Sequence, residues 1–292
     1  MTQLANPSAG TVGYRWKLLG DHLAGQAINV FPATGRLLKV RSILLFMAAA
    51  LILGAGKASE LPSARRELLL KSQSSVPLPP SALSGVLAGS VFFEGSKIPH
   101  ATLVENTTDP LACKRLQSLE NVLVSSRNHG IKNVILSLKG VPLPKDYRPN
   151  PSRLVLDNRE CRFQPHVAVL TTGSTIEAVN SDPIFHTVHL YGLRNLNLAL
   201  SPKSSKIVQT LSRPGYVIIK CDIHGWMQAF IRVDDHPFHA VSAADGSFRI
   251  EGIPPGTYTL EIWHEQFGPQ ETTVKVEAES VSRVTVYYRV SH

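Results

Sequence analysis

The sequence lacks the short motifs that mark the common hydrolases. Its 292 residues contain no Gly-x-Ser-x-Gly nucleophile motif and no His-Glu-x-x-His zinc motif. Paired His-x-His elements, which oxygen-reducing copper clusters require, are also absent. The sequence Trp263-His264-Glu265 has no partner at motif spacing, so we interpret it as a packed Trp beside a hydrogen-bonded His–Glu pair. We therefore expect the chain not to be an enzyme.

The excess of positive over negative charge is small once residues 1–58 are left out. The whole chain has 30 Lys and Arg against 22 Asp and Glu, but residues 1–58 hold six of the basic residues and one of the acidic ones. The remainder has 24 basic and 21 acidic residues, a net charge of +3. Because no dense basic patch interleaved with aromatic residues remains, we expect no nucleic-acid partner.

The apolar run near the amino end is too short for a typical membrane-spanning helix. Residues 42–55 make a run of fourteen, whereas a span needs about 20 residues. Three basic residues precede the run and small residues follow it, which is the layout of a secretory signal peptide. We expect residues 1–58 to be a leader cleaved near Ala58, and hence a periplasmic or extracellular protein without a stable membrane span. Because this leader is long, translation beginning near Val40 is an alternative.

Segments with helical periodicity are also missing, apart from a single turn expected around residues 109–119. From Gly85 onward, short apolar runs alternate with Gly, Pro, Asn and Asp, a pattern typical of an all-β sandwich. The clearest runs are residues 134–138, 167–170, 217–219 and 230–233. We expect a Pro- and Ser-rich linker over residues 59–85, one β unit over residues 86–235 and a second over residues 236–292.

Cysteine and methionine are rare, with three of each, and one of each lies in the sequence from Cys221 to Met227. In Cys221-x-x-His224-x-x-Met227, a tight loop between two strands can present three ligands to one metal. His186, at the start of a predicted strand, fits the role of the fourth ligand. A thiolate, two imidazoles and a distant thioether form the ligand set of a blue-copper centre. We therefore predict copper, as Cu(I) or Cu(II), at these four residues.

Other interpretations of these residues stay open. A single buried Cys or Met usually belongs to a hydrophobic core, but the joint spacing favours a metal. Zinc also binds a thiolate and two imidazoles, although it rarely recruits a thioether. His189 is a rival for the first ligand position. Because it lies three residues along the strand from His186, it points to the opposite face, and we interpret it as structural.

The other two cysteines suggest a disulfide. An odd number of Cys in an exported protein predicts one pair and one thiol with another use. With Cys221 assigned to the metal, Cys113 and Cys161 are the candidates for that pair. The alternative is a second metal site at Cys161 and His166.

The metal motif and its flanking sequences resemble a known family. Over residues 86–290 the chain is similar to the cupredoxins, with the loop spacing of the amicyanin branch, and within them to the methylamine-utilisation-like proteins of bacterial envelopes. The resemblance is carried by Cys161-Arg-Phe-Gln-Pro-His166-Val, Asn180-Ser-Asp182, His186, the Cys221 loop and Asp235-His-Pro237. It implies a Greek-key β-sandwich over residues 86–235, with His186, Cys221, His224 and Met227 as copper ligands.

The resemblance also implies how such a centre would exchange electrons. In cupredoxins the second His reaches the surface through an apolar patch, so His224 and Trp226 are the expected electron port, and the partner would be a transient redox protein. The sequence departs from the family pattern at two positions. Thr187 stands where Asn commonly ties the ligand loops together, and Gly225 stands where the amicyanin loop has Pro.

The carboxyl-terminal unit, residues 236–292, is similar to the carboxypeptidase regulatory-like β-sandwich. Its Asp-Gly sequence suits a hairpin, and its Pro-Pro-Gly-Thr-Tyr sequence suits a type II turn. That module is non-catalytic. Because the segment is short for a complete copy, we expect it to recruit the early strand near Gly89.

Three functions are compatible with these residues. The first is an exported electron carrier with a blue-copper centre. The second is a copper-handling or storage protein, which would use the same ligands. The third is a β-sandwich binding module whose metal site is vestigial.

Overall fold

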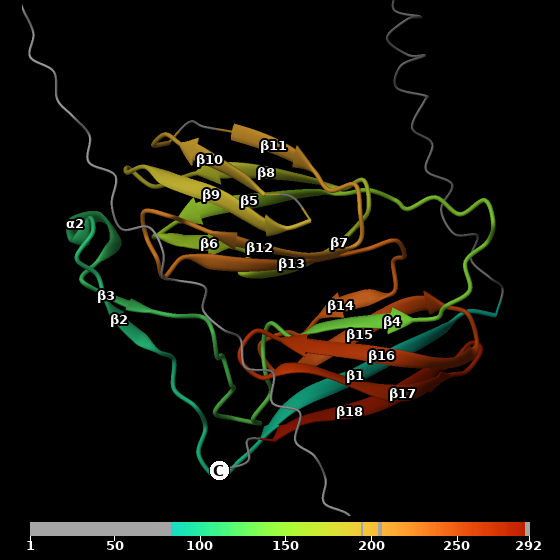
Figure 1. The fold of residues 1–292 in the computed structure, drawn as a ribbon. Coiled ribbons are helices and arrows are strands. Elements are labelled where there is room, and N and C mark those ends of the chain that lie inside the picture. Colours follow the sequence, from blue (N-terminus) through green and yellow to red (C-terminus); the bar gives the residue numbers. More distant parts are fainter. Residues whose placement is uncertain (1–82, 194, 204–205, 290–292) are drawn as a thin grey trace, which may run out of the picture. The chain divides into compact units, whose positions relative to one another are not determined.

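The computed structural model describes residues 83–193, 195–203 and 206–289 (Figure 1). These residues form strands joined by turns and loops, together with the short helix α2 (Pro110–Cys113). The all-β prediction is confirmed, and α2 lies inside residues 109–119, where a single helical turn was expected.

The predicted leader, residues 1–58, lies outside the described residues, as does the predicted linker up to residue 82. Within the part of the chain that the structure describes, no helix combines the length and hydrophobicity needed to cross a membrane. Export through a signal peptide therefore stays a prediction.

The first sandwich consists of two sheets that share one hydrophobic core. One sheet has the order β10 (Leu196–Leu200), β9 (His186–Gly192), β12 (Gly215–Lys220), β13 (Gln228–Asp234) and β7 (Val167–Thr171). The other has the order β11 (Lys206–Thr210), β8 (Thr175–Asn180), β5 (Arg153–Arg159) and β6 (Arg162–Gln164) (Figure 1).

The alternation of side chains along β9 turns His186 toward this core. Successive residues of a strand point to opposite faces, so every second residue shares one face. Val188 and Leu190 are buried in the core of the first sandwich, and His186, two residues before Val188, is fully buried on the same face. The apolar pattern of the strand therefore places an imidazole inside the protein.

The second sandwich also has two sheets around one core. The first sheet has the order β15 (Ser247–Ile253), β1 (Gly85–Glu94) and β18 (Val281–Arg289). The second has the order β14 (His239–Val241), β4 (Ile135–Lys139), β16 (Gly256–His264) and β17 (Gly268–Val276).

The strands of the second sandwich come from both sides of the boundary expected at residue 235. β1 lies between β15 and β18, so the expected recruitment of the early strand near Gly89 is confirmed. β4 lies between β14 and β16, although residues 134–138 were expected in the first unit. The division at residue 235 therefore does not follow the strand pairing. Pairing depends on apolar faces and backbone hydrogen bonds shared by distant segments, which the order along the chain does not reveal.

A small hairpin interrupts the chain between β1 and β4. β2 (Leu103–Glu105) pairs with β3 (Leu116–Ser118), and α2 lies between them; we call residues 103–118 the β2–β3 hairpin. Cys113, at the end of α2, forms a disulfide with Cys161, in the turn between β5 and β6. The disulfide fastens the hairpin to the first sandwich.

A buried charge network lies where β13 leaves the first sandwich. Asp234 is 1% exposed and accepts hydrogen bonds from Arg232 Nε at 2.7 Å, His239 Nδ1 at 2.9 Å and Ser137 Oγ at 3.0 Å. Ser137 belongs to β4 and His239 to β14. Burial alone would raise the pKa of Asp234, but the hydrogen bond from His239 and the charge of Arg232 hold it below its usual range. The carboxylate therefore joins strands of both sandwiches.

The position of β1 in the middle of its sheet leads to a stability prediction. Leu87 is 1% exposed and belongs to the core of the second sandwich. We expect Leu87→Ala to lower the free energy of unfolding by about 2 to 5 kcal/mol, since it leaves a cavity in that core. Denaturant unfolding would measure the loss. Val281→Ala, on the neighbouring β18 but 43% exposed, is the control and should change stability by less than about 0.5 kcal/mol.

The Asp234 network predicts a second, pH-dependent effect. Asp234→Asn should lower the free energy of unfolding at neutral pH by about 1 to 3 kcal/mol, because Arg232 loses Asp234 as a charged partner but keeps Glu261. Since the folded pKa of Asp234 is depressed, its contribution is present above the unfolded value of about 3.9 and is lost as the pH falls through the folded value.

Unfolding curves at a series of pH values would test this. The difference between wild type and Asp234→Asn should shrink as the solution is acidified below about pH 4. The exposed Asp146, in the loop between β4 and β5, provides the matched control Asp146→Asn. An Asp234→Asn variant as stable as Asp146→Asn would contradict the prediction.

Candidate metal centre

The loop between β12 and β13 presents three of the predicted ligands. Cys221 directly follows β12, and Met227 directly precedes β13. The backbone N–H of Cys221 donates to the carbonyl of Met227 at 3.2 Å, and the N–H of Met227 donates to the carbonyl of His224 at 2.9 Å. These two bonds close the loop, so one short segment holds the three side chains as the sequence spacing predicts.

Three of the four predicted ligands converge in the structure. Cys221 Sγ lies 3.9 Å from His186 Nδ1 and 3.7 Å from His224 Nδ1, and the two Nδ1 atoms are 3.1 Å apart. Both histidines are 0% exposed and Cys221 is 2% exposed. Their nitrogen and sulfur atoms lie close enough together to hold one metal ion. Met227 is 2% exposed and belongs to the same hydrophobic core as Cys221.

Each histidine is oriented by a carboxylate on its far side. His186 donates from Nε2 to Asp182 Oδ2 at 2.9 Å, and His224 donates from Nε2 to Asp109 Oδ2 at 3.2 Å. Both Nδ1 atoms are thereby left facing the sulfur of Cys221. Carboxylate partners of this kind fix the ring orientation and tautomer of metal-binding histidines.

The sequence contains a signal for one of the two carboxylates, Asp182, but not for Asp109. Asp182 lies in the turn from β8 to β9, where its N–H donates to Asn180 Oδ1 at 3.0 Å. Asn180-Ser-Asp182 is one of the segments that carry the family resemblance, but no role was predicted for Asp182 itself. Asp109 lies 115 residues before His224 and belongs to the β2–β3 hairpin. No local pattern marks it, because its role depends on where the hairpin folds back.

The environment of Cys221 favours the thiolate. Burial alone would raise the pKa of this thiol, but its contacts with His186, His224 and the backbone N–H of Thr187 lower it to about 5. Burial would lower the pKa of His186, but its contacts with Asp182 and Cys221 have a larger effect and raise that pKa to about 8.

Thr187 links the two segments that carry the ligands. Its backbone N–H donates to Cys221 Sγ at 3.3 Å, and its hydroxyl oxygen accepts from the N–H of Asp222 at 2.7 Å. The hydroxyl is also 3.8 Å from the sulfur. A single hydroxyl thus connects β9 to the ligand loop, which is the task expected of Asn in the resembled family.

The surroundings of His224 differ from those that the resemblance implies. His224 was expected to reach the surface, but its ring is 0% exposed because the β2–β3 hairpin brings Asp109 against it. Trp226, the other expected port residue, is half-buried. Its ring centroid lies 5.1 Å from that of His224, and its Nε1 donates to the carbonyl of Cys161 at 3.0 Å. Of the two residues, Trp226 alone combines partial exposure with contact to the centre.

The rival ligands have other partners. His189 bonds through Nδ1 to Asp222 at 3.0 Å and through Nε2 to Asn195 at 2.9 Å, on the outward side of β9. Cys161 is bound in the disulfide, so it offers no thiolate to a second site with His166. His166 instead bonds to Glu265 through Nε2. Glu265, expected to pair with its neighbour His264, therefore pairs with His166.

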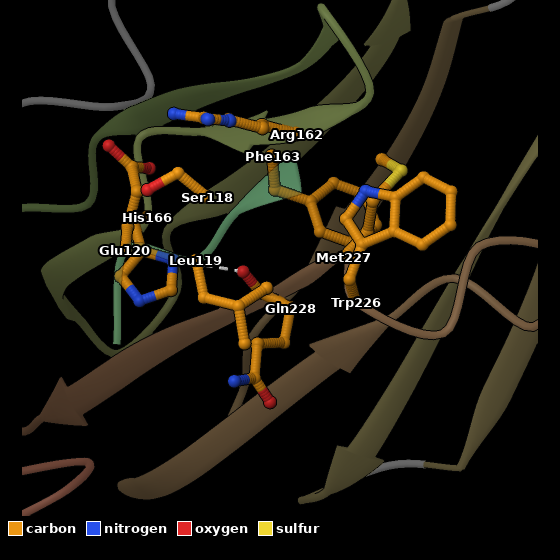
Figure 2. A pocket seen from close by; sticks show the side chains of 9 residues that line it. All are labelled: Ser118, Leu119, Glu120, Arg162, Phe163, His166, Trp226, Met227 and Gln228. Atoms are coloured by element: carbon orange, nitrogen blue, oxygen red, sulfur yellow. Dashed lines mark hydrogen bonds between the residues drawn. The ribbon is translucent and has the colours of Figure 1, made fainter. Parts of the chain in front are cut away.

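A small pocket borders the ligand loop on the side of Met227. Figure 2 shows its lining, which Trp226 and Met227 form together with residues of β3, β6 and the start of β13. The other lining residues are Ser118, Leu119, Glu120, Arg162, Phe163, His166 and Gln228. The predicted fourth ligand thus lies beside a pocket, although its side chain is as buried as that of Cys221.

Comparison with known proteins adds one family match. Residues 228–289 match the carboxypeptidase regulatory-like domain, which confirms the resemblance expected for residues 236–292 and extends it by eight residues. No curated protein matches the sequence.

Several solved structures show weak similarity to part of the chain. A copper-containing nitrite reductase from Thermus scotoductus SA-01 is 22% identical over 32% of this chain and 25% of its own, with a TM-score of 0.27. A purple cupredoxin from Nitrosopumilus maritimus is 15% identical over 28% of this chain and 99% of its own, with a TM-score of 0.26. Amicyanin from Paracoccus versutus is 15% identical over 34% and 97%, with a TM-score of 0.24. These values assign no activity to the chain, which spans a quarter of the nitrite reductase.

The lowered pKa of Cys221 can be measured without any metal. The ultraviolet absorption of the thiolate, taken as the difference between wild type and Cys221→Ser, should persist at neutral pH and disappear as the pH falls through about 5. Cys221 is the free cysteine of the chain, so the difference reports this thiol alone. A midpoint near the ordinary thiol value of about 8.5 would contradict the prediction.

Proposed function

We propose that this chain is a copper protein that passes single electrons, with His186, Cys221 and His224 as the principal ligands and Met227 as the fourth. The observation that carries the proposal is the buried group of one sulfur and two Nδ1 atoms, all within 3.9 Å of one another. One thiolate and two imidazoles, with a methionine at the end of the same loop, match the donor set of blue copper.

The residues present fit copper on chemical grounds. Hydrogen bonds lower the pKa of the Cys221 thiol, which favours the thiolate form that binds metals. The Nε2 atoms of both histidines face carboxylates, so Nδ1 of each ring is the atom placed to bind a metal beside the sulfur. Zinc shares this preference for thiolate and imidazole, and the methionine is what favours copper.

A blue-copper centre supplies one-electron chemistry, because one ligand arrangement serves both Cu(I) and Cu(II). The protein's own part is to keep that arrangement constant. The closed loop from Cys221 to Met227, the Thr187 contacts and the two carboxylates hold the donor atoms, and burial of both imidazoles keeps water from them. Such preorganisation leaves little to rearrange when the charge changes.

Electrons would enter and leave through the Trp226 side in this proposal. Trp226 contacts His224 and lines the pocket beside Met227. A redox partner would bind there transiently, through a small interface. The Cys113–Cys161 disulfide supports the predicted export, because disulfides persist in oxidising compartments.

Copper titration of the purified metal-free protein tests the proposal. One equivalent of Cu(II) should produce intense visible absorption from the copper–thiolate bond, and a mild reductant should abolish it. Cys221→Ser should remove the colour completely while leaving the circular dichroism of the fold unchanged.

Two results would overturn the proposal. A wild-type protein that stays colourless with Cu(II) would favour the vestigial site. A coloured protein that exchanges electrons slowly with small redox reagents, but transfers its copper readily to an acceptor, would favour copper handling.

A further inference from the structure

The β2–β3 hairpin places the carboxylate of Asp109 against the candidate metal centre. The hairpin belongs to neither sheet of the first sandwich. Asp109 Oδ2 lies 3.2 Å from His224 Nε2, and His224 is 0% exposed although Asp109 itself is 44% exposed. The carboxylate therefore stands between the imidazole and the solvent. Without the hairpin, the Nε2 side of His224 would lose both its hydrogen-bond acceptor and its cover.

The hairpin is held to the centre at Cys161. Cys161 is bonded through its sulfur to Cys113, four residues after Asp109. Its backbone N–H donates to Asp182 Oδ2 at 2.8 Å, and its carbonyl accepts from Trp226 Nε1 at 3.0 Å. Asp182 binds His186, so Cys161 connects the two carboxylates, Asp109 and Asp182, that face the imidazoles.

The backbone around this junction adopts a conformation that side chains rarely accept. Asp109 has φ 53°, and Glu160 and Cys161, on the other side of the disulfide, have φ 54° and 55°. Left-handed backbone at residues other than Gly is uncommon and persists where the surrounding structure enforces it. Asp is among the residues that tolerate it best, and here that conformation lies at the start of α2.

We propose that Asp109 is a positioning residue of the metal centre, held by the disulfide-anchored hairpin. It accepts the N–H at Nε2 of His224, so Nδ1 points toward the sulfur of Cys221 and the ring stays out of water. The inference rests on the proposed function as far as copper is concerned. The geometry itself is present in the metal-free protein, which allows the two to be tested separately.

The test compares three variants of the full chain. Asp109→Gly removes the carboxylate, and Gly accepts the left-handed backbone without strain. Asp109→Asn keeps an oxygen that can accept the N–H of His224, so it should restore part of the effect. Glu105→Gln is the control, because Glu105 is a carboxylate of the same hairpin that pairs with Arg115 on the surface.

The first measurements need no metal. In Asp109→Gly, the nitrogen resonances of the His224 ring should lose the signature of a fixed tautomer with the proton on Nε2. Cys221, the free thiol, should react faster with a thiol reagent than in wild type. Glu105→Gln should behave as wild type in both experiments. Equal His224 resonances and equal thiol reactivity in wild type and Asp109→Gly would overturn the positioning role.

The second measurement uses copper alone as the probe. We expect Asp109→Gly to weaken Cu(I) affinity, measured by competition with a chelator, by about 10- to 100-fold, the usual loss when the partner of a metal-binding histidine is removed. An unchanged Cu(I) affinity and reduction potential in Asp109→Gly would contradict the inference and leave the proposed function intact. If wild type binds no copper at all, the proposed function fails, and the metal-free measurements decide the role of Asp109 by themselves.

Discussion

The candidate centre depends on keeping the sulfur of Cys221 and two imidazoles together inside the first sandwich. An ionised group is costly to bury unless it is paired and hydrogen-bonded. Cys221 meets this condition through His186, His224 and the N–H of Thr187, and each imidazole in turn meets a carboxylate. The register of β9 and the closed loop after β12 keep these side chains together. A shift of one residue along β9 would turn His186 away from the sulfur.

The cover over His224 sets this centre apart from the arrangement that the resemblance implied. The β2–β3 hairpin replaces an open histidine edge with a hydrogen-bonded carboxylate, and Trp226 and the pocket beside Met227 become the accessible side. The same disulfide that anchors the hairpin also anchors Cys161, whose N–H holds Asp182. Access to the candidate centre and orientation of its candidate ligands thus depend on one junction.

The second sandwich is tied to the first through shared segments of chain. β1 and β4 precede the first sandwich in sequence but form the middle of sheets built from the carboxyl-terminal strands. Asp234, at the end of β13, binds Ser137 of β4 and His239 of β14. A carboxyl-terminal segment cut at residue 235 would lack two strands that cross its core.

The sequence alone determined the all-β class and the presence of Cys221, His224 and Met227 in one loop, because strand alternation and loop spacing are local properties. It also singled out His186 and the Cys113–Cys161 pair. Only the tertiary structure decided that Asp109 faces His224 and that β4 belongs to the second sandwich. These contacts join residues about a hundred positions apart, and no local pattern records which distant segments will share a core or a hydrogen bond.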